Sequence, residues 1–138
     1  MDLPERRETN VRKAGTELAD EANVVRLRGR LAAEPETRVL PSGDEITTWR
    51  LIVPRSPKDV RTRADGRRGV SVDTFDCSAW RSTQRRQARS WNTGDVVEVD
   101  GALQRRFYRH AGQLVSRHDV VAHQVRRVAR AADQEDET

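Results

Sequence analysis

The chain has 138 residues, of which 35% are apolar and 35% are charged, so it is long enough for one domain of ordinary size with a compact core. The net charge is +4, no apolar run approaches the roughly 18 residues of a membrane-spanning helix, and the N-terminal residues lack the apolar stretch of a secretory signal. Cys77 is the single cysteine, which excludes an internal disulfide and, with three scattered histidines, leaves no metal-ligand spacing. We therefore expect a cytoplasmic protein without a metal or another cofactor.

The charge is not spread evenly along the chain. Residues 1–22 hold four basic and six acidic groups, and residues 128–138 hold one basic and four acidic groups. The segment between them, 23–127, holds 21 basic and 12 acidic groups, a net charge of +9 that favours a polyanionic partner. We accordingly divide the chain into a flexible charged extension (1–22), a folded domain (23–128) and a short acidic disordered tail (129–138).

The first half of the folded domain has the two-residue period of β-strands. Residues 23–31 alternate apolar residues with arginines, 34–40 form a short extended piece, and 41–44 (PSGD) form a turn. Residues 45–54 form a strand that a proline ends. Residues 55–70 are a loop punctuated by proline and glycine, with six basic and two acidic residues, and we expect this loop to project from the domain.

The strand at 72–80 (VDTFDCSAW) has an unusual polar face. With side chains alternating between two faces, the apolar set that includes Phe75 points to the core. Trp80 points the other way, among small polar and acidic residues. Residues 81–92 follow as a weakly amphipathic helix that Gly94 ends.

The next strand ends with inward-facing Leu103, and 104–125 read as a long hairpin that turns near Ala111-Gly112. Carrying the alternation onward, Tyr108 faces outward and Phe107 faces inward. Five strands with one helix between the third and the fourth favour the mostly β class, and a five-stranded Greek-key barrel is the economical choice. Alternation of strands with helices is too sparse for a doubly wound sheet.

Exposed rings among guanidinium groups indicate a nucleic-acid surface. Trp80 and Tyr108 are two aromatic residues on polar faces, and the loop at 55–70 adds positive charge. Cations neutralise phosphates and release counterions, while exposed rings stack on unpaired bases. Because the bases of a duplex are already stacked, this combination favours single strands.

Several motifs resemble the bacterial single-stranded DNA-binding protein family, over residues 23 to about 128. They are Gly29-Arg30-Leu31, Pro35-Glu36-Thr37-Arg38, Pro41-Ser42-Gly43, Asp76-Cys77-Ser78-Ala79-Trp80 and Gly94-Asp95-x-Val97-x-Val99-x-Gly101-x-Leu103. The resemblance implies an OB-fold and a homo-oligomer, usually a tetramer, with a dimer as the alternative. It also implies sequence-tolerant binding to single-stranded DNA in replication, recombination and repair, and hence association with the nucleoid.

The resemblance and the charge pattern together select candidate site residues. Trp80 and Tyr108 match positions where the family stacks aromatic rings on bases, and Arg106 matches a position that contacts the nucleic-acid backbone. The predicted DNA-binding residues are Trp80, Tyr108, Arg106, Arg50, Lys58, Arg61, Arg63, Arg67 and Arg68. Thr74 stands where the family commonly has another stacking aromatic. Trp49 and Trp91 align with packing positions, so we expect both in the core.

The end of the chain differs from the family pattern. Relatives typically end in a disordered tail with an acidic tip that closes in Pro-Phe and docks replication and repair enzymes. This sequence ends in AADQEDET, which is acidic but has no aromatic residue. It gives no support for recruiting such enzymes through the tail, and it makes a specialised paralogue an alternative to a housekeeping protein.

Two other functions fit parts of the pattern. An RNA-binding or protein-interaction OB-fold module, such as a primosome component, would present a similar surface. A two-metal nuclease could be drawn from Asp73, Asp76, Glu98 and Asp100. However, Asp73 and Asp76 point to opposite faces of one strand, Glu98 and Asp100 are alternating polar residues of a half-exposed strand, and no histidine or lysine is spaced to act as a base. We therefore predict that the protein is not an enzyme.

Overall fold

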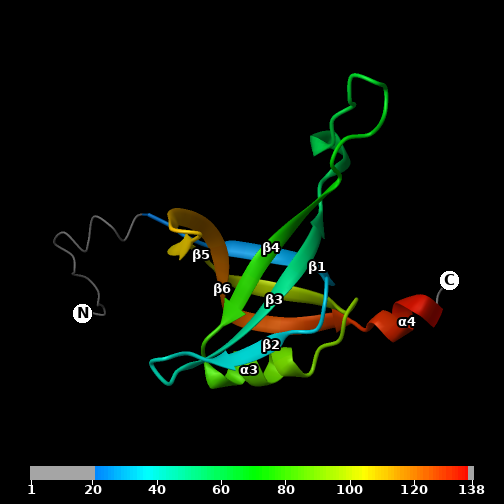
Figure 1. Ribbon diagram of the computed structural model, residues 1–138. Coiled ribbons are helices and arrows are strands. Elements are labelled where there is room, and N and C mark those ends of the chain that lie inside the picture. The colour runs from blue at the N-terminus through cyan, green and yellow to red at the C-terminus, as the bar shows by residue number, and fades with distance from the viewer. Residues whose placement is uncertain (1–20, 137–138) are drawn as a thin grey trace, which may run out of the picture.

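The structure is a computed structural model that describes residues 21–136. Six strands, two α-helices and a short 3-10 helix follow one another along this segment (Figure 1). In chain order they are β1 (Val25–Leu31), β2 (Glu36–Val39), β3 (Glu45–Pro54), η1 (Pro57–Asp59), β4 (Val72–Ala79), α3 (Ser82–Arg89), β5 (Val96–His110), β6 (Gln113–Ala129) and α4 (Ala131–Asp136). None of the helices in this part of the chain is long and apolar enough to cross a membrane. The predicted extension at 1–22 lies outside the described residues except for its last two.

Five of the strands close into a barrel, in the order β1, β5, β6, β4 and β3, with β1 paired to β3 to complete the ring. The pairs are antiparallel except for β4 with β6, which run parallel. β2 is antiparallel to β3 and lies outside the ring. Helix α3 lies between β4 and β5 in the chain. The predicted five-stranded barrel, with one helix between its third and fourth strands, is confirmed, and the short extended piece at 34–40 contributes β2.

Glycines allow the barrel strands to approach closely and bend. A Cβ atom on Gly101 of β5 would collide with the carbonyl oxygen of Val121 on β6, and one on Gly29 of β1 would collide with that of Ile52 on β3. The pairing of β5 with β6 also shifts register between Asp100 and Gly101. Such an irregularity bends a strand. The strands can therefore curve enough to close a small barrel.

The barrel interior contains both tryptophans that were predicted to be buried. Trp49 and Trp91 are each 4% exposed, and their rings meet edge to face with centroids 5.2 Å apart. The aliphatic core around them includes Leu31, Leu51, Val97, Val99, Val120 and Val125. Cys77 lies in the same cluster, where burial raises the pKa of its thiol to about 12. This cysteine is therefore a packing residue and not a reactive thiol.

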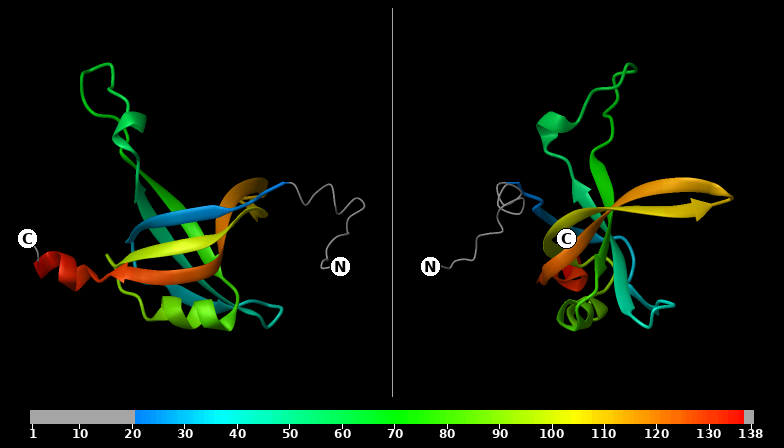
Figure 2. Two further views of the ribbon diagram at one scale, coloured as in Figure 1. Left: turned by 180° about the vertical axis from the view of Figure 1, so that it is seen from behind. Right: turned by 90° about the vertical axis from the view of Figure 1, so that its left-hand side faces the viewer.

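The hairpin of β5 and β6 extends past the barrel, and this corrects two predictions. It turns at Ala111 (φ 52°) and Gly112 (φ 81°), as predicted. Leu103 and Phe107 were expected to face inward, but they are 42% and 57% exposed. β5 is 15 residues long and β1 only 7, so the hairpin continues where no opposite wall covers its inner face (Figure 2). The alternation of side chains persists there, but it no longer distinguishes core from solvent.

A second projection is the basic loop, which we define as residues 55–71 between β3 and β4. It leaves the barrel in a different direction from the β5–β6 hairpin (Figure 2). Its base has an ion pair between Arg55 and Asp73 at 2.8 Å, and a bridge joins Thr62 to Arg68 nearer its tip. The projection expected from its composition is therefore present.

The described part of the segment that was predicted as a tail (129–138) contains the end of β6 and helix α4. The buried carboxylate of Asp95 holds the start of this helix against the barrel. It accepts hydrogen bonds from the backbone N–H groups of Ala131 (2.9 Å), at the start of α4, and Asn92 (2.9 Å), and from the Arg127 guanidinium (3.4 Å). Burial alone would raise the pKa of Asp95, but these hydrogen bonds outweigh it and lower the pKa. The acidic composition of the tail could not reveal this long-range contact.

Candidate nucleic-acid interface

A groove with a volume of about 960 Å³ crosses the outside of the barrel. Its lining comes from the segment after β1, from β2, β3 and β4, and from the β5–β6 hairpin. Strand β3 contributes Arg50, the end of β4 contributes Trp80, and the hairpin contributes Arg106, Phe107 and Arg117. We call this feature the central groove. Its size is typical of sites that hold small molecules or short segments of a polymer.

Trp80 occupies the groove as the sequence pattern suggested. It follows β4 directly and is 42% exposed, which is a large fraction for a tryptophan. The guanidinium of Arg85, on helix α3, donates a hydrogen bond to the backbone carbonyl of Trp80. This contact ties the end of β4 to the helix and fixes the backbone from which the ring projects.

The groove arginines are held in place by carboxylates. Asp76 on β4 accepts hydrogen bonds from Arg50 Nε through Oδ1 and from Arg117 Nη1 through Oδ2, both at 3.0 Å. Asp119 on β6 accepts one from Arg106 Nε at 2.6 Å, and this bond raises the pKa of the arginine. Guanidinium groups from three strands thus have defined orientations, two of them through the shared Asp76 and the third through Asp119.

Positive and negative side chains nearly balance in the central groove. Its cations are Arg38, Arg50, Arg105, Arg106 and Arg117. Its anions are Glu34, Glu36, Asp76 and Asp119. The groove therefore has a formal charge of only +1 from five cations and four anions. The +9 charge of the folded segment is concentrated elsewhere.

The structure separates the two aromatic residues of the hairpin. Tyr108 is half-buried, lies outside the set of residues that line the groove, and has the Arg106 guanidinium 5.4 Å from its ring centroid. Phe107 is 57% exposed, lines the groove, and has the Arg105 guanidinium 5.1 Å from its centroid. Of the predicted stacking pair, only Trp80 is therefore in the groove. The binding role of Tyr108 stays a prediction.

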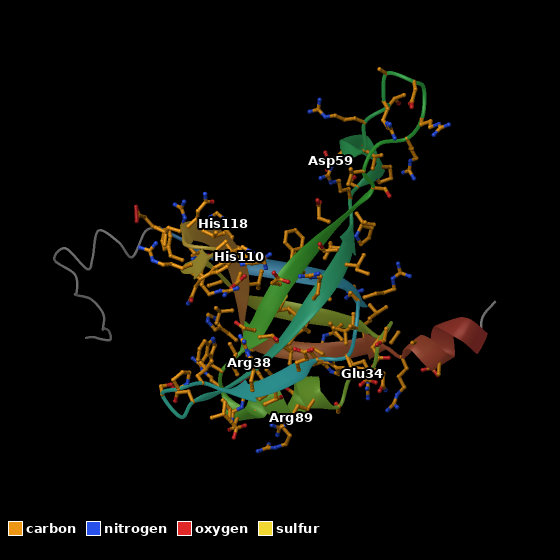
Figure 3. The ribbon with its side chains drawn as sticks, in the orientation of Figure 1. Glu34, Arg38, Asp59, Arg89, His110 and His118 are labelled. Atoms are coloured by element: carbon orange, nitrogen blue, oxygen red, sulfur yellow. The ribbon has the colours of Figure 1, made fainter. Side chains whose placement is uncertain are left out.

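The five predicted cations of the basic loop lie away from the groove. Lys58, Arg61, Arg63, Arg67 and Arg68 are all exposed, and none lines it. Figure 3 labels Asp59 on this loop, and His110 and His118 on the separate β5–β6 hairpin. The structure thus brings Trp80, Arg50 and Arg106 together and places the loop cations on another part of the surface.

Arg117, Asp76, Asp119 and Phe107 were not selected from the sequence. A signal for one of them was available: once the hairpin turns at Ala111-Gly112, Arg106 must pair with Arg117, as it does. The partnership of Asp76 with Arg50 depends on β3 pairing with β4 across the basic loop, and the exposure of Phe107 depends on where the barrel ends. Neither follows from alternation alone.

The four acids that could suggest a nuclease are each engaged by arginine. Asp73 pairs with Arg55, and Asp76 with Arg50 and Arg117. On the opposite side of the barrel, Glu98 pairs with Arg28 and Arg126, and Asp100 with Arg26. Within residues 21–136 no group of three or more candidate ligands could hold a metal ion. The ion pairs explain why these acids occur on exposed strands.

Comparison with known proteins identifies the family of the chain. A family model described as the single-strand binding protein family matches residues 22–128. Single-stranded DNA-binding protein A of Bacillus subtilis is 36% identical over 104 residues, which cover 75% of this chain and 57% of that protein. Single-stranded DNA-binding protein 2 of Listeria innocua is 34% identical over 104 residues, with coverages of 75% and 62%. The chain thus spans less than two thirds of the length of these two relatives.

A solved structure has the same architecture. The structure described as Plasmodium falciparum SSB complex with ssDNA aligns with a TM-score of 0.64 and 17% sequence identity, covering 78% of this chain and 96% of that one. At this identity the likeness establishes the shared fold, which confirms the predicted OB-fold. With the family model spanning most of the barrel sequence, the chain belongs to the single-strand binding protein family.

Proposed function

We propose that this protein binds single-stranded DNA with little regard to sequence, as a homo-oligomer, in DNA replication, recombination and repair. It acts as a binding protein and not as an enzyme, in the cytoplasm and on DNA of the nucleoid. The observation that carries the proposal is the 42% exposed ring of Trp80 in a groove lined by arginines from four strands. Family membership and relatives named as single-stranded DNA-binding proteins support it.

Binding in the central groove combines stacking with exchange of ion pairs. An unpaired base stacks on Trp80, which contributes about 1–3 kcal/mol whatever the base. A phosphate then replaces a carboxylate as the partner of Arg50, Arg106 or Arg117. The side chains of these arginines are about half exposed, and Asp76 is one-third exposed, so its pairs with Arg50 and Arg117 contribute little stability. The exchange therefore costs little at Arg50 and Arg117 and more at Arg106, whose partner Asp119 is largely buried, and each guanidinium is already oriented for it.

The basic loop adds contacts that depend on charge alone. Its six cations outnumber its two anions, and the excess positive charge can neutralise phosphates of a strand that leaves the groove. Such contacts do not distinguish one base from another. The loop therefore raises affinity for all sequences, which fits a protein that protects any exposed single strand.

The test uses the intrinsic fluorescence of the protein. Trp80 is the exposed one of three tryptophans, because Trp49 and Trp91 are buried. Titration with oligo-dT should quench part of the emission, and a Trp80→Phe variant should lose that quenching. A duplex of the same length should bind much more weakly. Tighter binding of a matched RNA oligomer, or equal binding of the duplex, would contradict the proposal.

A further inference from the structure

We propose that Phe107, supported by Arg105, is a second base-stacking site of the central groove. The inference rests on the proposed binding of single strands. Phe107 lines the same groove as Trp80 and is the more exposed of the two rings, at 57% against 42%. An exposed phenylalanine that faces a groove gains from stacking on the flat face of a base.

Arg105 prepares the ring for this role. Its guanidinium lies 5.1 Å from the ring centroid, and its Nε donates a 2.8 Å hydrogen bond to the Oγ of Ser116 on β6. The cation covers one face of the ring, so a base can stack on the other. Because Arg105 also lines the groove, the same guanidinium can neutralise the phosphate of the stacked nucleotide.

The other ring of the hairpin is a weaker candidate. On β5, Tyr108 projects to the face opposite to that of Phe107, is half-buried, and lies outside the groove lining. Its neighbour Arg106 is held by Asp119 at 2.6 Å. Arg106 shares the face of Tyr108 and also lines the groove, so both faces of this end of the hairpin border it, and Phe107 is the hairpin ring that belongs to the groove lining.

A contact with a second copy of the chain is the main alternative use of this ring. Leu103 and Leu114 share its face of the hairpin and are 42% and 63% exposed, so an apolar strip exists there. Neither leucine lines the groove, whereas Phe107 does. The charged surroundings of Phe107 in the groove suit a nucleotide better than the apolar face of another subunit.

The first experiment compares three variants with the wild type by titration with oligo-dT at fixed salt. Phe107→Leu keeps an apolar side chain but removes the ring, and we expect Kd to rise about 5- to 150-fold. Phe107→Trp should retain wild-type affinity or exceed it. Leu114→Ala, the matched control on the same face of the hairpin but outside the groove lining, should change Kd by less than about twofold. Melting temperatures should match the wild type, since Phe107 lies outside the core.

The second experiment detects contact directly. Phe107→Trp in a Trp80→Phe background places a new indole at the proposed site, while Trp49 and Trp91 give a constant buried signal. Oligo-dT should quench the new indole. Absence of quenching would overturn the proposal, and so would an unchanged Kd for Phe107→Leu. A Phe107→Leu variant that alters the sedimentation coefficient while each subunit keeps its affinity would also overturn it, because the ring would then contact another subunit. A wild-type protein that does not bind oligo-dT would instead contradict the proposed function itself.

Discussion

The central groove and the basic loop use arginine in different ways. In the groove five arginines face four acids, and Arg50, Arg106 and Arg117 are held by carboxylates at 2.6–3.0 Å. The basic loop has six cations against two acids. Within the described residues Lys58, Arg61 and Arg67 form no ion pair with a side chain of the loop or the barrel. One region fixes the direction of its cations, and the other offers net charge.

This difference assigns each region a share of the binding free energy. A nearly neutral groove attracts a polyanion weakly from a distance, so its contribution comes from short-range stacking and oriented hydrogen bonds. A loop with excess charge attracts phosphates over about 8 Å at physiological salt. We therefore expect the groove to determine affinity at high salt and the loop to determine how affinity depends on salt.

The largest expected effect concerns the stability of the fold and not the binding of DNA by the groove or the loop. Trp49→Ala should lower the free energy of unfolding by about 3–5 kcal/mol, because the indole is 4% exposed and packs edge to face on Trp91. Unfolding by denaturant measures this loss of free energy. Folded protein that remains at low temperature should still bind oligo-dT. A variant of unchanged stability would mean that the barrel core is packed differently.

The next effect concerns the groove ring. Trp80→Ala should weaken binding to oligo-dT by about 1–3 kcal/mol with little change in unfolding free energy, because the side chain is 42% exposed. It removes no charge, so the slope of log K against log salt should stay that of the wild type. Loss of stability with intact affinity would show that the ring closes the barrel end instead of facing bases.

Substitutions in the basic loop should change the salt dependence of binding, which Trp80→Ala should leave unchanged. Replacing Arg61, Arg63, Arg67 and Arg68 with glutamine should weaken binding to every sequence alike. It should also flatten the slope of log K against log salt by about 0.7 for each phosphate that the variant no longer neutralises. At physiological salt the loss of affinity should be smaller than that of Trp80→Ala, since screening acts on exposed charges. An unchanged slope would mean that the loop points away from the bound strand.

The contrast between the two regions also explains what could be predicted from the sequence. Strand alternation, glycines and turn residues are local signals, so the barrel and the projecting loop followed from them, whereas the burial of Trp49 and Trp91 was expected from the family resemblance. The excess charge of the loop lies in one continuous segment and is equally visible. The groove is assembled across strands: Asp76 meets Arg50 across 26 residues and Arg117 across 41. Its charge balance therefore depends on which β-strands pair with each other, and the pattern of residues along one β-strand does not contain this information.

The smallest effect tests whether the groove carboxylates restrain binding. Asp76→Asn removes the shared partner of Arg50 and Arg117, so two guanidinium groups become available to phosphate without an exchange of ion pairs. We expect oligo-dT to bind more tightly at low salt by about 0.2–1 kcal/mol, the range for one exposed ion pair. The slope of log K against log salt should steepen, because the groove would then bind phosphates through excess positive charge, as the loop does.

A matched control for this variant is Glu98→Gln on the opposite side of the barrel. Glu98 likewise engages two arginines, Arg28 and Arg126, but it lies outside the central groove. Its replacement adds the same unit of net charge, so it reports the general effect of charge on binding. If both variants tighten binding equally, the effect is that of net charge alone. If Asp76→Asn weakens binding, then the orientation of the two arginines by Asp76 contributes more to affinity than the release of their charge.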